Sequence, residues 1–433
     1  MTSTNKITLN DKAWNALFKK YNILSEISNK GYCVISASQI KEFREPRLMV
    51  KFDKLSYKPQ IFDKEKLSIL PITRGKYIIS DFNSHHKLEP PSNKYDFREF
   101  PSYIESVNPT NISSESVALN TADSMNILSH FIDDEMMVPT VSGRRSSGEF
   151  DFNIIRNKKD KLHIEVSNSQ IEVDGAWEGL NYLSLIEAKM DYPDDFIIRQ
   201  LYYPFRVFNK IIEKPIKNIF LFYSNNQFSL YEYVFEDINC YHSLKLNKQC
   251  NYLIYDGEIF LEDITGIYES VNIQPEPNVP FPQANSFERV INLCEHLKNQ
   301  KLTKEQIAEI YSFDNRQSDY YTNAGLYLGL IDKNRIDGKI YYSLSKKGQQ
   351  IFNMLFKEKQ LELVKCILRH EVFYKLFEYC TKNEDLPDNN TVIEYMEKCK
   401  LRIEKETIKR RASSVLAWIK WIFKLTDIEI DNF

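Results

Sequence analysis

Two neighbouring apolar segments that run into acidic residues constrain the fold of this chain more than any other feature. Residues 171–173 lead into Asp174, and residues 183–186 lead into Glu187 and Lys189, which are separated by one alanine. The nearly continuous apolar run 183–186 is typical of a strand that is buried on both faces. Side chains alternate along a strand, so Glu187 and Lys189 are expected on one face. If the two strands pair, Asp174 and Glu187 meet at one edge of the sheet, beside Lys189.

This combination of side chains predicts a magnesium site. Mg²⁺ prefers oxygen ligands and completes its shell with water and phosphate. A lysine beside such a metal can position or deprotonate a water molecule, which together gives metal-assisted phosphodiester hydrolysis. The alternative is a Glu-x-Lys pattern on a solvated strand without any catalytic role. Charges that follow a buried strand are costly unless they are paired or bind a metal, and this favours the functional interpretation.

The spacing of these residues resembles that of the PD-(D/E)xK nuclease superfamily, which includes most type II restriction endonucleases. The resemblance implies that Asp174 and Glu187 bind Mg²⁺ and that Lys189 assists the attacking water. Val173 stands where the family name has proline. A helix expected over 194–206 resembles the fourth motif of the RecB-like branch, which implies that Gln200 orients the substrate or a metal-bound water. Tyrosine follows this glutamine after three residues instead of the usual four.

Three further acids are candidates for the metal site. Glu115 falls in the first turn of a helix for which Ser113 is a suitable N-cap. In the superfamily a glutamate on this helix often contacts the metal through water, and the alternative is an interaction with the helix dipole. Asp151 lies on the polar face of an alternating strand, and Glu178 lies between the two motif strands. Both are rivals of Asp174 as the first metal ligand.

The charge is unevenly distributed along the chain, although the total is only −3. Residues 1–100 carry a net charge of +7, residues 101–283 carry −13 and residues 284–433 carry +3. An acidic middle between basic flanks is expected of a metal-carboxylate domain between DNA-holding domains, although such sums also drift by chance. Within the acidic middle, Arg144 and Arg145 lie in a polar loop at 140–149 and suit a phosphate clamp.

The basic N-terminal flank predicts a DNA reader. Helices are expected over 11–21 and 24–29, followed by a strand at 32–35, a helix from 37 capped by Ser36, and a basic extended segment at 44–53. This order is consistent with a winged-helix-like domain. The residues expected to face DNA are Gln39, Lys41, Arg44 and Arg47. The alternative is a solvated basic surface.

Four prolines within 274–282 mark a domain boundary. Three expected helices and a hairpin around Asp337-Gly338 then predict a winged helix-turn-helix. Its third helix carries the candidate base readers Arg316, Gln317 and Tyr320, in a segment similar to ones in restriction endonucleases. The alternative is a dimer or protein contact. A final helix over 406–422 offers Lys409, Arg410 and Arg411, of which at least one faces solvent or phosphate.

These features predict an α/β (α+β multidomain) protein. We expect a winged-helix-like DNA recognition domain at 1–105, a PD-(D/E)xK-like nuclease domain with an α-β-β-β-α-β core at 106–274, and a winged helix-turn-helix and helical domain at 284–433. The predicted function is that of a type II restriction enzyme, a sequence-specific, Mg²⁺-dependent endonuclease of double-stranded DNA. The alternatives are a non-catalytic winged-helix DNA-binding regulator and a DNA repair or structure-specific nuclease.

The expected partners follow from this function. One motif per chain cuts one strand, so cleavage of both strands predicts a homodimer, with a nicking monomer as the alternative. A cognate DNA methyltransferase is expected to act on the same site. No apolar run is long enough to span a membrane and the first residues lack the apolar core of a signal peptide. The seven scattered cysteines contain no CxxC pair, so we expect a bacterial or archaeal cytoplasmic protein.

Overall fold

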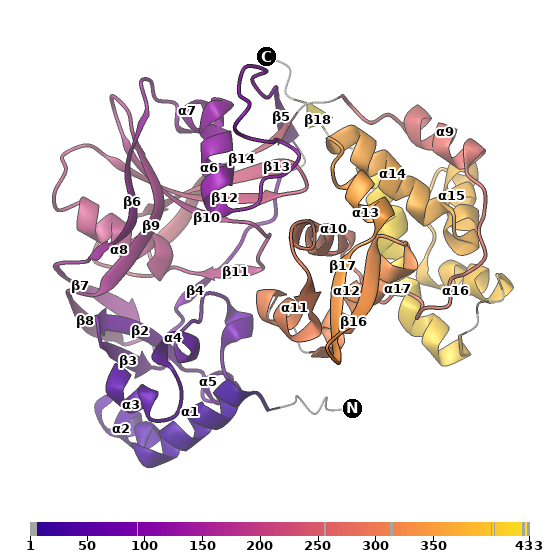
Figure 1. Cartoon of the computed structure of the whole chain (residues 1–433). Helices are drawn as coiled ribbons and strands as arrows, with labels where there is room; N and C mark the ends of the chain where they lie inside the picture. The colour runs from indigo at the N-terminus through magenta and orange to yellow at the C-terminus, as the bar shows by residue number, and fades with distance from the viewer. Residues whose placement is uncertain are drawn as a thin grey trace. The chain divides into compact units, whose positions relative to one another are not determined.

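The computed structural model describes residues 7–92, 94–254, 257–311, 315–399, 401, 403–426 and 429–430. The chain is mixed α/β, as expected, and divides into two compact units (Figure 1). The first unit comprises the described residues up to Pro91 together with Ala118–Phe222 and Ser229–Cys250. The second unit comprises Ser92–Val117, Tyr223–Phe228 and the described residues from Asn251 onward. Each unit is described by itself.

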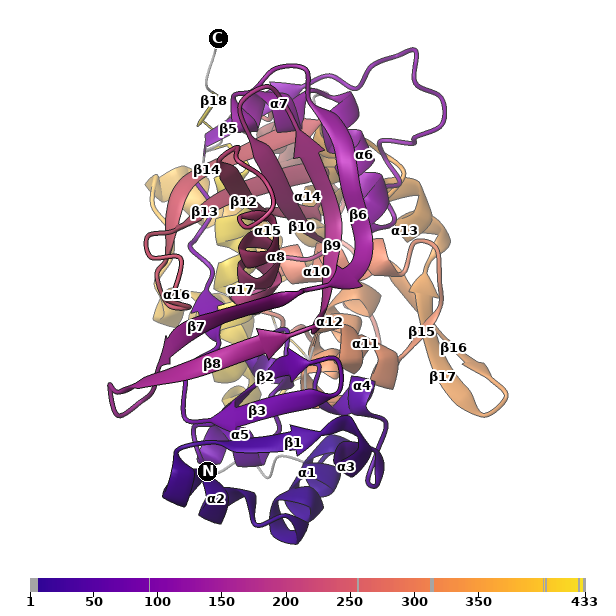
Figure 2. The same ribbon diagram turned by 90° about the vertical axis from the view of Figure 1, so that its left-hand side faces the viewer.

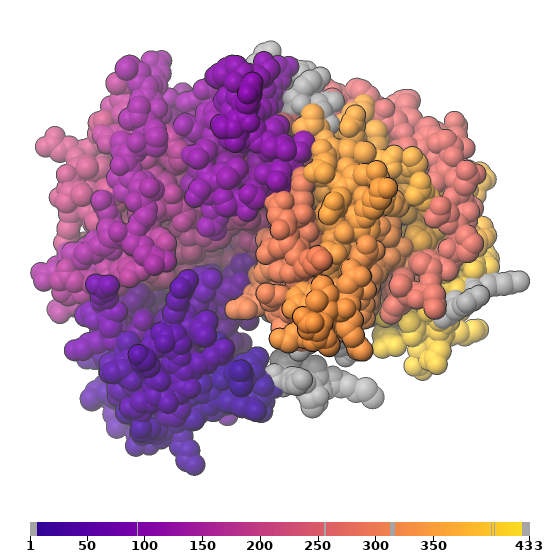
Figure 3. Space-filling view, in the orientation of Figure 1, coloured from indigo at the N-terminus to yellow at the C-terminus, as the bar shows by residue number. Residues whose placement is uncertain are grey.

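The first unit opens with a lobe of short helices around a small sheet, residues 9–80, which we call the N-terminal lobe. In chain order its elements are α1 (Leu9–Lys20), α2 (Ile23–Lys30), β1 (Cys33–Ser36), α3 (Ala37–Lys41), α4 (Pro46–Met49), the 3-10 helix η1 (Leu55–Tyr57), α5 (Gln60–Lys64), β2 (Ser68–Thr73) and β3 (Lys76–Ser80). The sheet order is β1-β3-β2, and all its pairs are antiparallel. Figure 3 shows the lobe in indigo.

A helix N-cap and the packing of aromatic side chains stabilise this lobe. The predicted cap at Ser36 is confirmed, since its hydroxyl accepts a hydrogen bond from the backbone N–H of Gln39. Trp14 is fully buried, packs on Phe62 at 4.8 Å between ring centroids, and donates its indole N–H to the carbonyl of Met49 over 3.0 Å. The expectation of an extended segment over 44–53 is wrong for its first part, because proline at the first position starts helix α4.

The large sheet of the first unit carries the two apolar motif strands. In chain order the next elements are β4 (His85–Lys87), β5 (Lys94–Arg98), α6 (Glu115–Ser124), α7 (Ile127–Ile132), β6 (Val138–Ser146), β7 (Glu149–Ile155), β8 (Lys161–Ser167), β9 (Gln170–Glu178), β10 (Leu183–Lys189), β11 (Asp195–Ile197), α8 (Arg199–Phe208), β12 (Ile216–Ser224), β13 (Gln227–Phe235) and β14 (Leu244–Ile254). Of these, β5, the first three residues of α6, the junction of β12 with β13 and the end of β14 belong to the second unit. The strand order is β14-β13-β12-β10-β9-β6. Strands β6, β9 and β10 pair antiparallel, whereas β10 and β12 pair parallel.

Several boundaries differ from those expected. The predicted polar loop at 140–149 is mostly the edge strand β6, which twists through register shifts and a left-handed Gly143 with φ of 90°. The helix expected from 194 starts only at Arg199, because β11 first pairs with β4. Ser114, and not Ser113, lies at the start of α6 and accepts the backbone N–H of Val117 over 3.3 Å.

Strands β7 and β8 form a separate antiparallel hairpin that is inserted between β6 and β9. Their inward side chains form a hydrophobic cluster with residues of α8, β2 and β3. Figure 2 shows the hairpin beside β2 and β3. Phe152 lies 5.2 Å from Tyr202 and 6.1 Å from Tyr203 between ring centroids, and all three residues are fully buried. This aromatic layer joins the N-terminal lobe to the strands of the motif.

The second unit is mainly helical. Its elements after β14 are α9 (Leu261–Ser270), α10 (Phe287–His296), β15 (Leu302–Thr303), α11 (Lys304–Tyr311), α12 (Asn315–Tyr327), β16 (Ile331–Ile336), β17 (Lys339–Leu344), α13 (Lys346–Ile351), α14 (Phe356–Leu368), α15 (Glu371–Asn383), α16 (Asn389–Lys398), α17 (Lys405–Lys424) and β18 (Glu429–Ile430). The small sheet has the order β15-β17-β16. Within this unit β5 pairs parallel with the end of β14 and with β18.

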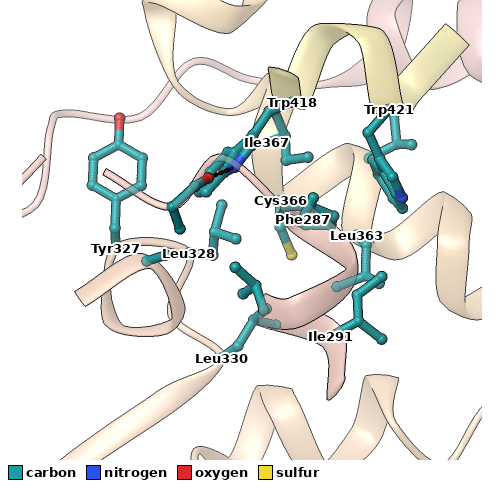
Figure 4. Packing of buried hydrophobic residues seen from close by; sticks show 14 of the residues in the cluster. Phe287, Ile291, Tyr327, Leu328, Leu330, Leu363, Cys366, Ile367, Trp418 and Trp421 are labelled. Atoms are coloured by element: carbon teal, nitrogen blue, oxygen red, sulfur yellow. Dashed lines mark hydrogen bonds between the residues drawn. The ribbon is translucent and has the colours of Figure 1, made fainter. Parts of the chain in front are cut away.

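The predicted hairpin at Asp337-Gly338 is confirmed, and both residues have positive φ, as a two-residue turn of this kind requires. The core of the unit gathers side chains from α10, α12, α14 and α17 (Figure 4). Phe287 packs on Trp418 at 5.0 Å and on Trp421 at 4.3 Å between ring centroids. Among the described residues, no helix is long and apolar enough to cross a bilayer.

Candidate active site

The pairing of β9 with β10 brings the two motif acids together. The last paired positions are Ile186 and Gly175, so Glu187 and Asp174 occupy the next opposed positions of the two strands. Directly opposed side chains of an antiparallel pair lie on the same face of the sheet. Asp174 is in the middle of β9 and not at its end, as the sequence had suggested. Its Oδ2 accepts the backbone N–H of Ala188 over 2.9 Å, which fixes its side chain to β10.

Lys189 completes a compact charged cluster on this face. Its Nζ lies 2.6 Å from Oε1 of Glu187 and 3.9 Å from Oδ2 of Asp174, and it also donates to the carbonyl of Ala188 over 3.0 Å. The side chains of Glu187, Asp174 and Lys189 are 10%, 19% and 21% exposed. The alternation that predicted a common face for Glu187 and Lys189 therefore holds in the structure.

Helix α8 adds the fourth predicted residue. Gln200 lies in its first turn and donates its side-chain amide to Oε1 of Glu187 over 2.5 Å. Leu201 anchors the same turn in the core. Tyr203 is directed away from the cluster, because it is fully buried and its hydroxyl donates to the carbonyl of Pro71 over 2.9 Å. Burial also raises the pKa of Tyr203, so this phenol stays protonated.

A shallow pocket opens beside the cluster. It is lined by Glu172, Val173, Leu185, Ile186, Glu187, Gln200, Leu201 and Pro204. Glu172 was not among the predicted site residues, although it lies two positions before Asp174 and therefore faces the same side of β9. The alternation in Glu172-Val173-Asp174 was the signal that would have revealed it. Arg144 on β6 donates Nε to Oε1 of Glu172 over 3.2 Å.

The donor set fits a hard divalent cation. Asp174 and Glu187 offer carboxylate oxygens from adjacent strands, and the nearby ammonium of Lys189 shows that the site attracts a positive charge. Within the described part of the chain, no group of three or more His, Cys, Asp or Glu side chains is arranged to hold a metal ion. Asp174 and Glu187 could therefore supply only part of the shell of such an ion, and the other ligands would have to come from outside these two side chains.

Two of the other predicted acids are not brought to this cluster. Asp151 is exposed on the separate β7–β8 hairpin, where its Oδ2 lies 3.7 Å from Nε2 of His163. Glu178 accepts a hydrogen bond from Lys214 over 2.8 Å. It is four residues from Asp174 along β9, which corresponds to about 13 Å. Glu115 is the first residue of α6 and belongs to the second unit, so its role stays a prediction.

A buried carboxylate fixes the connection between the two motif strands. Asp134 is 6% exposed and accepts hydrogen bonds from the backbone N–H groups of Glu135, Asn181 and Tyr182 and from the side-chain amide of Asn181. Burial alone would raise the pKa of Asp134, but these hydrogen bonds outweigh burial and lower it. Hydrogen bonds to the carboxylate of Asp134 therefore stabilise the turn that connects β9 with β10.

The predicted DNA-binding residues of the N-terminal lobe differ in their availability. The side-chain oxygen of Gln39 accepts both the backbone N–H and the hydroxyl of Ser36, each over 2.8 Å, so it serves the helix cap. Arg44 donates to Asn10 over 2.5 Å. Lys41 and Arg47 are exposed. In the motif unit Arg144 and Arg145 are also exposed, and the guanidinium of Arg145 lies 5.0 Å from the ring of Phe208.

The predicted DNA-binding residues of the second unit lie on α12 and α17. Gln317 is exposed, whereas the side chain of Arg316 lies outside the described part of the structure. The guanidinium of Arg411 lies 5.9 Å from the ring of Tyr320 and also binds Gln283, so α17 is packed beside α12. Lys409 and Arg410 are exposed, as the spacing of the three basic residues had predicted.

Three family models match the chain, and each is described as a domain of unknown function. DUF6996 covers residues 11–79, DUF6997 covers residues 80–253 and DUF7226 covers residues 289–427. The first match coincides with the N-terminal lobe and the second contains the whole candidate site. No curated protein and no solved structure matches the chain.

Proposed function

We propose that this protein is a Mg²⁺-dependent endonuclease of double-stranded DNA, related to the PD-(D/E)xK superfamily and acting as a type II restriction enzyme. The observation that carries the proposal is the cluster of Asp174, Glu187, Lys189 and Gln200. These four residues come from β9, β10 and α8, and every one of them contacts another member of the cluster. Two carboxylates beside a single ammonium leave an excess of negative charge that a divalent cation would balance.

The connectivity supports the same function. In chain order α6, β6, β9, β10, α8 and β12 are consistent with the α-β-β-β-α-β core that the resemblance implies, with α7, the β7–β8 hairpin and β11 as additional elements. Three antiparallel strands are followed by a helix and a strand that pairs parallel to the third. The acids then lie on the second and third strands of this core. Fold alone does not establish activity, which depends on the side chains of the site.

The chemistry divides among the four side chains. Asp174 and Glu187 would hold Mg²⁺, which supplies Lewis-acid polarisation of the phosphate and a lower pKa for bound water. Lys189 positions the attacking water and stabilises negative charge on the phosphate oxygens. Gln200 fixes the rotamer of Glu187 through its hydrogen bond, and the bond from Ala188 fixes Asp174. Arg144, beside the pocket, is suited to binding an adjacent phosphate.

The second unit offers a surface for the DNA itself. The order α10, β15, α11, α12, β16, β17 with the sheet order β15-β17-β16 supports a winged helix. Ile331 on β16 packs against α12 at Gly325, and Lys333 and Arg335 continue the same face of β16 further along the projecting hairpin (Figure 2). Both are exposed and have no ion-pair partner among the described residues. They are suited to phosphate contacts beside α12.

The proposal includes partners. Because one cluster per chain cuts one strand, cleavage of both strands requires two copies, and we propose a homodimer on DNA. A DNA methyltransferase that modifies the same site would protect the host DNA from such an enzyme. Sedimentation with a duplex in Ca²⁺, which supports binding without cleavage in the proposed scheme, counts the chains on each DNA. One chain per duplex with accumulation of nicked circles contradicts the dimer.

The test of the activity is a digest of supercoiled plasmid with the purified full-length protein and Mg²⁺. Discrete linear fragments are expected for sequence-specific cutting, whereas a ladder or nicked circles alone point to a structure-specific nuclease. Glu187→Gln is expected to abolish cleavage while DNA binding in a gel shift persists. Asp151→Asn, on the separate hairpin, is the matched control and is expected to cut normally. Binding without any cleavage by the unaltered protein would favour a non-catalytic regulator.

A further inference from the structure

The segment 190–198 joins the two halves of the proposed site, because it runs from the end of β10 to the start of α8. One side of this segment packs on the sheet. Tyr192 lies 5.2 Å from Phe222, and Phe196 lies 4.3 Å from Phe220, between ring centroids. In the parallel pairing of β10 with β12, these phenylalanines stand opposite Lys189 and Glu187. The segment therefore rests on the strand positions next to the catalytic side chains.

The other side of the segment is bound by the N-terminal lobe. Lys54 forms an ion pair with Asp191, and the two side chains are only 16% and 17% exposed. The backbone N–H of Leu55 donates to Oδ1 of Asp195 over 2.6 Å. The backbone N–H of Ile197 donates to the carbonyl of Asp53 over 3.1 Å. Three consecutive residues of the lobe thus hold both ends of a segment that begins directly after the catalytic lysine.

Asp53, Lys54 and Leu55 follow directly after Phe52, which is fixed to the core of the lobe. The carbonyl of Phe52 accepts a hydrogen bond from Nε2 of His85 over 2.7 Å, and the ring of Phe52 packs 5.0 Å from that of Phe62. His85 belongs to β4, which pairs with β11 inside the segment (Figure 1). A displacement of the lobe would therefore move Asp191, which is two residues from Lys189.

We infer that Lys54 is a positioning residue, whose ion pair with Asp191 makes the geometry of the catalytic lysine depend on the placement of the N-terminal lobe. The inference rests on the proposed function, because the lobe carries exposed basic residues suited to double-stranded DNA. Contact of the lobe with DNA then holds Lys189 in its working position. Reactive groups must be placed closely, since an error of about 1 Å can cost on the order of a hundredfold in rate.

The test compares Lys54→Met, Lys54→Arg and the exchanged pair Lys54→Asp with Asp191→Lys in the full-length protein. Lys245→Met is the matched control, because Lys245 lies outside the lobe, is 66% exposed and forms an ion pair with Glu236 over 3.0 Å. Single-turnover cleavage of supercoiled plasmid with Mg²⁺ gives the rate, and fluorescence anisotropy with labelled duplex in Ca²⁺ gives the Kd. Lys54→Met is expected to lower the rate about 10- to 100-fold with the Kd within about twofold. Lys54→Arg and the exchanged pair are expected to restore most of the rate.

Hydrogen exchange supplies a readout that does not depend on cleavage. In Lys54→Met the amides of 188–197 are expected to exchange faster than in the unaltered protein, while those of α1 stay protected, which shows that the lobe is folded. A Kd that rises in step with the loss of rate would overturn the inference, because Lys54 would then be a DNA contact. Normal cleavage by Lys54→Met would overturn it as well. Failure of the unaltered protein to cut overturns the proposed function itself, whatever this variant does.

Discussion

The side-chain amide of Gln200 donates to Oε1 of Glu187 over 2.5 Å, and the same oxygen accepts the ammonium of Lys189 over 2.6 Å. One carboxylate oxygen thus joins α8 to β10. Glu187 is buried, so its orientation depends on these two donors and on the packing around them. Glu187 is a proposed metal ligand, and the loss of a hydrogen bond to a metal ligand typically changes metal affinity or activity.

Replacement of Gln200 by leucine is therefore expected to raise the Mg²⁺ concentration for half-maximal cleavage by about 10- to 100-fold. Leucine keeps the volume but offers no donor to Glu187. A Mg²⁺ titration of plasmid cleavage measures the change. Gln349→Leu, at an exposed position of α13, serves as the control. An unchanged Mg²⁺ requirement for Gln200→Leu would show that Glu187 is oriented without this amide.

Asp134 is expected to be important for stability rather than for chemistry. In the unaltered protein several N–H groups donate to the carboxylate of Asp134, and Asp134→Asn replaces this carboxylate by an uncharged amide. Hydrogen bonds to charged groups contribute about 1.5–3 kcal/mol each. Allowing for partial compensation, we expect the free energy of unfolding to fall by about 2–3 kcal/mol in urea denaturation. Asp133→Asn is the neighbouring control, since Asp133 is exposed and asparagine tolerates its left-handed backbone. Equal stability of both variants would refute the role of the buried carboxylate.

His85 predicts a dependence of stability on pH. It is 4% exposed, and burial lowers its pKa to about 4, although its hydrogen bond to Phe52 opposes this shift. Below the unfolded pKa of about 6.5 the unfolded chain binds a proton that the native state excludes, so stability falls as the pH decreases and the full loss is reached below about pH 4. Between pH 7.5 and 5 this histidine should account for about 2 kcal/mol.

The variant His85→Gln, which keeps a donor for the carbonyl of Phe52, should lack this part of the pH dependence. Urea unfolding at the two pH values measures it, with His163→Gln as the control because His163 is exposed. A pH profile for His85→Gln that parallels that of the unaltered protein would contradict the prediction. This measurement also reports on the N-terminal lobe. His85 binds the carbonyl of Phe52, which directly precedes the three residues 53–55 that contact the segment 190–198.

The projecting hairpin of the second unit predicts an effect on DNA binding alone. Lys333→Ala combined with Arg335→Ala removes two proposed phosphate contacts, so the slope of log K against log salt should become shallower by about 2. Anisotropy at several salt concentrations gives this slope. Lys346→Ala, on exposed α13, is the control. Weaker binding with an unchanged slope would mean that the hairpin makes no phosphate contact.

Strand alternation was sufficient to predict that Glu187 and Lys189 share a face, because a period of two leaves no other arrangement in a regular strand. The Asp337-Gly338 pair was in turn sufficient to predict the hairpin, because a two-residue turn of this kind needs residues that tolerate positive φ. The sequence did not predict the use of Gln39 in a helix cap, because a side chain that can read a base can equally bind its own backbone. It also missed Glu172, whose importance depends on the pairing of β9 with β6.

Other parts of the site depend on distant packing. The segment 194–198 resembles the start of a helix, yet the pairing with β4 holds Asp195–Ile197 as a strand. A local pattern cannot predict this choice, since the partner strand lies more than a hundred residues earlier in the chain. For the same reason the contact of Lys54 with Asp191 has no signal in the sequence. Single acids and bases on loops pair according to the tertiary fold.

The β9–β10 hairpin has a consequence for the order in which the protein folds. Asp174 and Glu187 lie within one hairpin, so closing the short connection between them costs little chain entropy compared with the parallel pairing of β10 and β12, which awaits α8. Hairpins of this kind form in about 1–10 μs, well before distant strands meet. The two carboxylates are thus opposed before Gln200 docks, and Lys189, the last residue of the same hairpin, offsets only one of their two negative charges.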